Sequence, residues 1–303
     1  MVRFLSRRIV SMILAIFVVI TLTFFLMNLV PGGPFNTEKL SPKAAAILEN
    51  KYGLNQPLLK QYTDYLGDLL RGDLGVSIKK VGYTVNELIA EKFPVSASVG
   101  GIAICIAVIL GIPAGVIAAM KRNTVIDRII MFICTLGVSV PSFIVATLLL
   151  YVFGIKLAIL PTMRLNSAAS YIMPAVALSL SPLCYITRLT RSSMMEAMEQ
   201  DYIKTAQAKG LSRLTVIGKH ALRNSVIPVI TYLGPLTAAI LTGGFVVENI
   251  FSIPGLGKYF VESISNRDYP MIMGTTIFFA LLLLVLNFIV DLLYKVVDPR
   301  IKY

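Results

Sequence analysis

Six stretches of this 303-residue chain are apolar over lengths close to the thickness of a bilayer. A helix of about 20 apolar residues crosses the hydrocarbon core of a membrane. The composition agrees, because 56% of the residues are hydrophobic and only 15% are charged, which is too apolar for a soluble domain. The apolar runs cover residues 9–30, 99–120, 129–153, 171–187, 226–247 and 271–294. We therefore expect an all-α polytopic membrane protein with six transmembrane helices.

Some of these runs carry features that bear on their interpretation. Three arginines precede the first run, as in a secretory signal peptide, but the run is longer than a usual signal core and the Pro-Gly-Gly-Pro after it is no cleavage site. We expect a retained span. The third run contains Pro141, and the fourth is short and broken by Pro174 and Pro182. Gly111 and Gly115 have the spacing that lets membrane helices approach closely.

Residues 31–94 form the one sizeable polar segment between the apolar runs. It carries eight Lys/Arg and seven Asp/Glu residues, so it is nearly neutral. Two stretches, 43–52 and 57–70, show the spacing of amphipathic helices. The apolar positions in the second stretch are Leu58, Tyr62, Tyr65, Leu66 and Leu69. We expect a small helical extracytoplasmic subdomain, with a loosely packed loop as the alternative.

The distribution of charge predicts the orientation in the membrane. Segments on one side of the six expected spans sum to +11, and those on the other side sum to +3. The positive side faces the cytoplasm in membrane proteins. Both termini and residues 196–228 are therefore expected in the cytoplasm, and 31–94 outside it. The basic residues flank the apolar runs, so the net charge of +12 does not indicate a nucleic-acid partner.

Motifs for catalysis or metal binding are missing from the sequence. No Gly-x4-Gly-Lys-Ser/Thr loop, HExxH or Gly-x-Ser-x-Gly pattern occurs, and His220 is the single histidine. Cys105, Cys134 and Cys184 lack ligand spacing, and we expect them to be small core residues, with a metal or disulfide role as the alternative. No apolar run has a charged residue near its middle, whereas ion-coupled carriers usually need one there. A partner is therefore expected to supply the energy for transport.

The polar segment 196–228 predicts a hairpin of two helices. Asp201 can cap the first helix, Gly210 can supply the left-handed residue that ends it, and Ser212 can cap the second. Small residues near the turn would let another protein approach closely, although a solvated linker is the alternative. One stripe of the second helix is expected to face inward, and its members are Leu214, Ile217, Ala221 and Ser225.

The spacing of Lys204-Thr205-Ala206-x-x-x-Gly210 resembles the Glu-Ala-Ala-x-x-x-Gly loop of ABC importer permeases. The longer pattern DYIKTAQAKGL…HALRN…PV looks like the dipeptide, oligopeptide and nickel branch of that family, and most like its B-type oligopeptide subunits. Lys204 departs from the family's Glu, and Pro228 stands later than the family's usual Leu-Pro. YGLNQPL…GDLG, ENIFSIPGLG, NRDYP and the final Asp-Pro-Arg are similar to other signatures of this branch.

The resemblance implies a type I importer fold and a bacterial cytoplasmic membrane location. It implies a heterodimer with a second permease, two cytoplasmic ATPases that use ATP and Mg, an extracytoplasmic binding protein, and contact with membrane lipid. The chain itself is expected to bind no cofactor. Its parts would be 1–30 (amino end and first span), 31–94 (outer subdomain) and 95–303 (five-span core with the coupling loop at 196–228). The residues expected to contact an ATPase are Asp201, Tyr202, Lys204, Thr205, Ala206, Ala208, Lys209, Gly210 and Leu211.

The expected function is import of oligopeptides by alternating access. A dipeptide or nickel importer remains an alternative within the same family, since the coupling loop does not report the cargo. A self-contained channel or secondary carrier is the alternative from another class.

Overall fold

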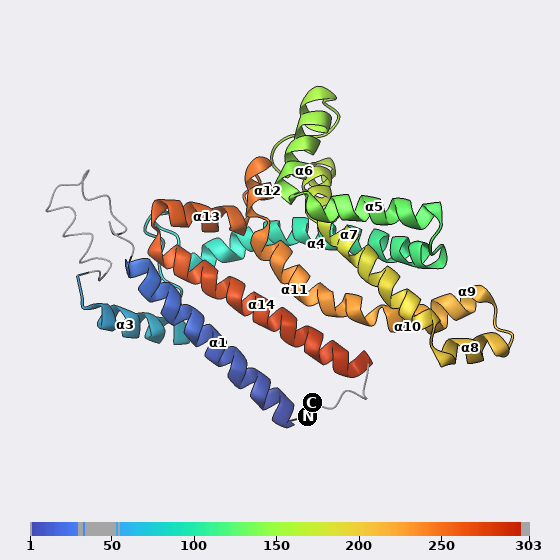
Figure 1. The fold of residues 1–303 in the computed structure, drawn as a ribbon. Helices are drawn as coiled ribbons and strands as arrows, with labels where there is room; N and C mark the ends of the chain where they lie inside the picture. The colour runs from blue at the N-terminus through green and yellow to red at the C-terminus, as the bar shows by residue number, and fades with distance from the viewer. Residues whose placement is uncertain (1, 30–32, 34–52, 54, 298–303) are drawn as a thin grey trace. The chain divides into compact units, whose positions relative to one another are not determined.

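The computed structural model describes residues 2–29, 33, 53 and 55–297, and in this part of the chain β-pairing is limited to one bridge between Val76 and Thr84. Figure 1 shows the helices. Their bounds are α1 Val2–Leu29, α3 Leu58–Leu70, α4 Val85–Met120, α5 Val125–Ser139, α6 Ser142–Leu149, the π-helix η2 Leu150–Lys156, the 3₁₀-helix η3 Ala168–Tyr171, α7 Ile172–Met198, α8 Asp201–Ala208, α9 Arg213–Thr215, the π-helix η4 Val216–Ala221, α10 Leu222–Ser225, α11 Ile227–Gly243, α12 Phe245–Ile250, α13 Leu256–Asn266 and α14 Tyr269–Val297.

The chain forms two compact units. One comprises Met1–Pro94 with Gly255–Leu284, and the other comprises Val95–Pro254 with Val285–Tyr303. The three-part division expected from the sequence stays a prediction.

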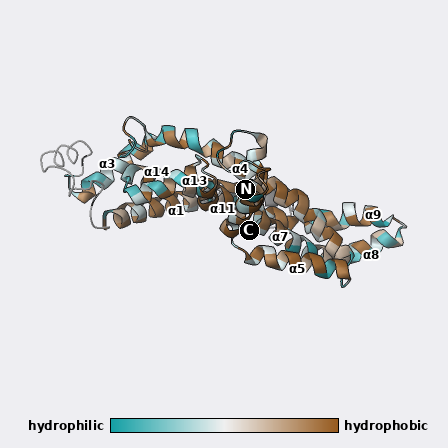
Figure 2. Ribbon diagram, turned by 90° about the horizontal axis from the view of Figure 1, so that it is seen from above, coloured by the Kyte–Doolittle hydropathy of each residue, from teal (hydrophilic) through white to brown (hydrophobic). Residues whose placement is uncertain are grey.

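The described helices agree with a polytopic membrane protein. Five of them are long and apolar enough to cross a bilayer, and a sixth span results if the bent pair α5 and α6–η2 counts as one. Hydrophobic residues predominate along α5, α7 and α11 in Figure 2. The all-α fold class is therefore confirmed.

The third apolar run is not the continuous span that we expected. Helix α5 ends at Ser139, Val140 is extended with ψ of 120°, and α6 begins at Ser142. The two helices meet at an angle of 99°. Pro141 explains the break, because proline has no N–H for the helix and disfavours helical geometry at the residue before it.

The fourth apolar run is longer and more regular than expected. Helix α7 continues without interruption through Pro182 to Met198. Pro174 lies in the first turn of the helix, where a missing N–H costs nothing. Neighbouring helices make an internal proline tolerable in membrane helices, so the expectation of a broken span was wrong.

In the second unit, small residues let two helices approach α7. A Cβ atom at Gly115 of α4 would lie 2.6 Å from the carbonyl oxygen of Thr187. A Cβ atom at Gly137 of α5 would collide with the sulfur of Cys184. The close contact expected from the Gly111/Gly115 spacing is thus present. Cys134 and Cys184 are buried as expected, but Cys105 is exposed and is not a core residue.

The glutamate of the ENIFSIPGLG signature also lies in the second unit. Glu248 belongs to α12, within the candidate span Ile227–Ile250, rather than beyond the end of the span as expected. Its carboxylate is buried and accepts a hydrogen bond of 2.5 Å from the hydroxyl of Ser96. This contact joins α4 to α12.

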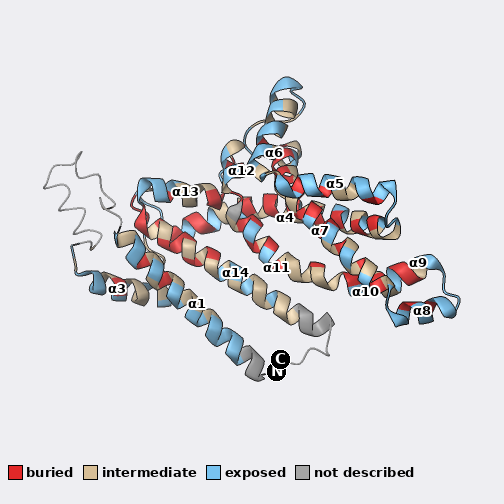
Figure 3. Cartoon of the chain, viewed as in Figure 1, coloured by how far each residue is buried: buried red, intermediate tan, exposed pale blue. Residues whose placement is uncertain are grey.

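In the first unit, α3 is the amphipathic helix expected at 57–70. Tyr62 is buried and its hydroxyl lies 2.7 Å from that of Thr21 on α1. Tyr65, Leu66 and Leu69 pack in the same cluster, whereas Leu58 is exposed and does not take part in it. Much of the rest of α1 is exposed (Figure 3). The other expected helix, 43–52, and the final Asp-Pro-Arg lie outside the described residues.

The NRDYP signature fixes a loop of the first unit through one carboxylate. Asp268 is buried and accepts hydrogen bonds from the hydroxyl of Ser77 and from the backbone N–H groups of Ile78 and Lys79, the latter two at 3.1 and 3.3 Å. Arg267 before it adopts the left-handed conformation with φ of 57° and ends α13. Asp268 therefore has a structural role that its sequence context did not reveal.

Candidate coupling site

The candidate site is a helical hairpin that follows α7 in the second unit. It consists of α8, a turn at Gly210, α9, η4 and α10, and α11 follows directly. In Figure 1 the paired helices α8 and α9 lie beyond the ends of α7 and α10. The expected helix–glycine–helix order is therefore present.

The turn between α8 and α9 has the geometry of a Schellman motif. Gly210 has φ of +76°, its N–H donates to Gln207 O at 2.9 Å, and the N–H of Leu211 donates to Ala206 O at 3.3 Å. A left-handed residue at this position ends a helix and satisfies its last carbonyl groups. No atom lies within 4 Å of a Cβ built on Gly210, so the backbone conformation alone requires glycine there.

A small apolar core holds the two arms of the hairpin together. Ile203 and Ala206 of α8 contact Val216 and Ile217 of η4, and all four are buried. The same cluster includes residues at the ends of two longer helices, namely Met194, Ala197, Met198, Val116, Ala119 and Met120. A displacement of the hairpin would thus be transmitted to α4 as well as to α7.

Eight of the nine residues expected to contact an ATPase are exposed. They are Asp201, Tyr202, Lys204, Thr205, Ala208, Lys209, Gly210 and Leu211. The ninth, Ala206, is 5% exposed and belongs to the hairpin core. Its side chain packs against the opposite arm, and its part in the ATPase contact stays a prediction.

Two details of the hairpin differ from the sequence prediction. Leu214 is 79% exposed, although it was expected on the inward stripe with Ile217. The chain changes from α9 to the π-helix η4 after Thr215, and the α-helical period on which the stripe was drawn does not hold across that change. Asp201 is the first residue of α8 rather than its cap, and its carboxylate accepts from Lys204 Nζ at 2.8 Å. Ser212 does cap α9, since its hydroxyl accepts from Thr215 N.

The exposed side of the hairpin combines apolar and basic residues. Tyr202, Leu211 and Leu214 are large apolar residues that face away from the hairpin core. Lys209 and Arg213 are exposed beside them. Exposed apolar groups on a rigid element indicate a surface for another protein.

Sequence reasoning missed an ion pair at the base of the hairpin. The guanidinium of Arg191 on α7 donates to both carboxylate oxygens of Asp127 on α5, at 2.6 and 2.8 Å. Asp127 is buried and also accepts from the N–H of Asn123 at 2.9 Å. A second pair, Arg122 with Glu199 at 3.1 Å, is largely exposed. The partners of the two pairs are 64 and 77 positions apart in the sequence, so no local pattern predicts either pair.

The site has no sign of catalytic or metal chemistry. Among residues 2–29, 33, 53 and 55–297, no three His, Cys, Asp or Glu side chains come together as metal ligands. His220, in η4, is partly buried. What the hairpin offers is a shaped protein surface on a rigid base.

Comparisons with known proteins agree with this geometry. Residues 111–303 match the family described as "Binding-protein-dependent transport system inner membrane component", and residues 1–100 match the N-terminal family of such membrane components. The dipeptide transport system permease protein DppB of Bacillus subtilis is 50% identical over 303 residues, which cover 100% of this chain and 98% of that protein. The oligopeptide transport system permease protein OppB of Salmonella typhimurium is 46% identical over 306 residues and is covered completely, as is this chain.

A solved structure shows the same fold. It is the MetNI methionine ABC transporter in an inward-facing conformation, with a TM-score of 0.57 at 15% identity, covering 70% of this chain and 96% of that one. These findings confirm the resemblance to ABC importer permeases of the peptide branch. The chain belongs to the family of inner-membrane components of binding-protein-dependent transport systems, and it is a transport subunit rather than an enzyme.

Proposed function

We propose that this chain is one permease subunit of an ATP-driven importer of peptides, with oligopeptides as the main substrate. The observation that carries the proposal is the similarity over the full chain to permeases named for oligopeptide and dipeptide transport. A second, homologous permease completes the pathway, and an extracytoplasmic binding protein delivers the peptide. The chain binds no cofactor itself, since two cytoplasmic ATPases use the ATP and Mg.

The hairpin is the contact through which the ATPases drive the permease. A groove on an ATPase holds α8 and the turn, with Tyr202, Leu211 and Leu214 as apolar anchors and Lys209 at the rim. A helix lying in a groove is a common mode of protein recognition. When ATP closes the two ATPases, the hairpin moves as one body because its arms share a core. The motion reaches α7 and α4 through that core, and α5 through the Arg191–Asp127 pair.

The orientation follows from charge. We propose that both termini and the hairpin lie in the cytoplasm and that α3 lies outside it, because +11 of the flanking charge falls on the hairpin side and +3 on the other. In a chain whose three cysteines are replaced, Ser212→Cys should react only with reagents in the cytoplasm and Lys60→Cys only with reagents outside. Reaction of both from one side would contradict this orientation.

Reconstitution tests the function directly. The chain, produced together with its second permease, the two ATPases and the binding protein, should accumulate a labelled peptide in proteoliposomes only when ATP is supplied on the ATPase side. Leu214→Asp should release the ATPases and abolish uptake while the permease pair stays intact. Lys219→Asp on the same hairpin, away from the apolar anchors, serves as the control. Uptake by this chain alone would instead identify a secondary carrier or channel.

A further inference from the structure

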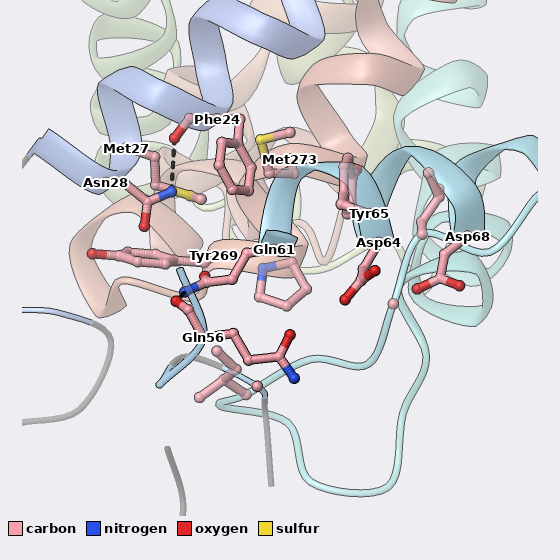
Figure 4. A pocket seen from close by; sticks show the side chains of 15 residues that line it. Phe24, Met27, Asn28, Gln56, Gln61, Asp64, Tyr65, Asp68, Tyr269 and Met273 are labelled. Carbon is pink, nitrogen blue, oxygen red and sulfur yellow. Dashed lines mark hydrogen bonds between the residues drawn. The ribbon is translucent and has the colours of Figure 1, made fainter. Parts of the chain in front are cut away.

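A cavity of about 240 Å³ lies within the first unit. Its walls come from the carboxyl end of α1, from α3, from the loop 74–78 and from the start of α14. Figure 4 shows Asp64, Asp68, Gln61 and Asn28 around it. The established family assignment gives this cavity no role.

The charged residues among the described lining are both acidic. Asp64 and Asp68 lie one turn apart on α3 and both are exposed at the cavity. None of the described residues that line the cavity is Lys, Arg or His. An anionic ligand would be repelled by this arrangement, whereas a cation would be attracted.

Aromatic rings form much of the remaining wall. Phe24, Tyr65 and Tyr269 all line the cavity, together with apolar groups such as Met27 and Met273. The faces of aromatic rings attract organic cations, and the apolar groups suit a hydrocarbon stem beside the charge. Carboxylates and aromatic rings together therefore indicate an organic cation rather than a hydrated metal ion.

One polar atom behind this wall has no protein partner. The hydroxyl of Tyr65 is buried and makes no hydrogen bond within the described part of the chain. Burial raises the pKa of Tyr65 well above its usual value, so the hydroxyl stays neutral and adds no charge beside the cavity. Asn28 uses its amide nitrogen within α1, donating to Phe24 O at 2.8 Å, and therefore presents an acceptor oxygen.

We propose that this cavity binds a primary ammonium group carried on a short apolar stem, with Asp64 and Asp68 facing the charge. Its volume is below the usual range of about 300–1,000 Å³ for complete ligand sites, so it holds one end of a longer molecule. Two molecules at an outer membrane surface present such an end: the amino terminus of a peptide and the headgroup of an ethanolamine phospholipid. The peptide source rests on the proposed function, and the lipid source does not.

Binding by the full-length chain, paired with its second permease in nanodiscs, tests the proposal. One arm measures trileucine against N-acetyl-trileucine by equilibrium dialysis, in nanodiscs of dioleoylphosphatidylcholine. The other arm measures retention of dioleoylphosphatidylethanolamine against dioleoylphosphatidylcholine by native mass spectrometry. The variants are Asp64→Asn with Asp68→Asn, Tyr65→Phe, and Glu262→Gln as an exposed control in the same unit.

The free amine should bind better than its blocked or methylated counterpart in one of the two arms. The double Asp variant should lose about tenfold in that preference, as expected for removal of a hydrogen bond to a charged group, Tyr65→Phe should lose less, and Glu262→Gln should lose nothing. Preference for trileucine assigns the peptide source, and preference for the ethanolamine lipid assigns the lipid source. Equal binding of both members of each pair, or equal behaviour of the double variant and the control, overturns the proposal. If the cavity does not bind an ammonium group, the parent chain should still take up peptide when ATP is supplied. If the proposed function is wrong, the parent chain should show no ATP-driven peptide uptake.

Discussion

The hairpin 196–228 and the loop 72–84 are both polar segments with a fixed shape, and different interactions hold them. Both contain glycine with positive φ, at Gly210 in the hairpin and at Gly72, Gly75 and Gly82 in the loop. The hairpin is held by side chains packed in an apolar core. The loop is held mainly by hydrogen bonds: those to the carboxylate of Asp268, those that Asn86 makes with Leu74 N and Gly72 O, and the bridge between Val76 and Thr84.

This difference has consequences for how each region responds to change. Packing energy is spread over many contacts, so a hairpin can move as a body and accept substitutions on its surface. In the loop, by contrast, three donors share the one buried carboxylate of Asp268, and all three lose a charged acceptor if that group is removed. The hairpin is thus suited to transmit a displacement, and the loop is suited to present a fixed surface.

The ion pair at the base of the hairpin allows a test of whether packing alone holds this region. Arg191→Gln should lower the free energy of unfolding by about 3–5 kcal/mol, because it leaves the buried carboxylate of Asp127 without its counter-charge. Thermal unfolding of the purified permease pair measures the loss. Arg122→Gln, which breaks an exposed pair, should cost at most about 1 kcal/mol. A small effect of Arg191→Gln would mean that packing alone holds this region.

Removal of the Asp268 carboxylate is the matching test on the loop 72–84. Asp268→Asn should cost about 2–4 kcal/mol, since hydrogen bonds to a charged acceptor are worth more than neutral ones and the amide can accept through one oxygen only. Limited proteolysis of the purified permease pair should then cleave within 72–84. Asp73→Asn is the control, because Asp73 is exposed and accepts only from Gly75 N among the bonds resolved in this loop. Resistance of Asp268→Asn to cleavage would show that the bonds of Asn86 and the Val76–Thr84 bridge are enough to hold the loop.

The sequence predicted the hairpin better than it predicted the loop. A glycine after a short helix and a serine before the next are local signals, and Gly210 and Ser212 act as those signals predict. Asp268 and Ser77 are 191 positions apart, and no periodicity joins them. Likewise, the pairing of Arg191 with Asp127 depends on the approach of α5 to α7, which glycine spacing suggests only for α4.

Two differences from the predicted hairpin, at Leu214 and Ala206, have local causes. The inward stripe of the hairpin assumed an α-helical period, and the π-helix η4 shifted Leu214 outward. Ala206 was expected on the docking surface because small residues permit close approach, but the same smallness suits it to the contact between the two arms. The sequence could not distinguish an internal close contact from an external one.

A substitution at Gly210 tests whether the shape of the hairpin matters for coupling, because only the positive φ at this position calls for glycine. Gly210→Val should cost about 1–2 kcal/mol from backbone strain and should reduce co-purified ATPase and substrate-stimulated ATP turnover, with normal membrane levels and normal pairing of the permeases. Gly210→Ala should give a smaller loss. Gly218→Ala is the matched control, since Gly218 also has open space around it but lies within a helix, where alanine is favoured. Full coupling by Gly210→Val would show that the hairpin does not transmit the motion.

Lys204→Glu should have the smallest effect, although it reverses a charge and introduces the residue of the resembled family. The pair that Lys204 forms with Asp201 is 69% and 95% exposed at the two side chains, so its loss removes at most about 0.5 kcal/mol. A glutamate this near the start of α8 also interacts favourably with the helix dipole, which offsets part of the new repulsion. ATP turnover and ATPase co-purification should stay within about twofold of the parent, since a change of about 0.5 kcal/mol corresponds to roughly that factor. A loss comparable to that of Gly210→Val would mean that the ammonium of Lys204 contacts an acidic group of the ATPase directly. Docking would then depend on one charged contact rather than on the apolar side chains of Tyr202, Leu211 and Leu214.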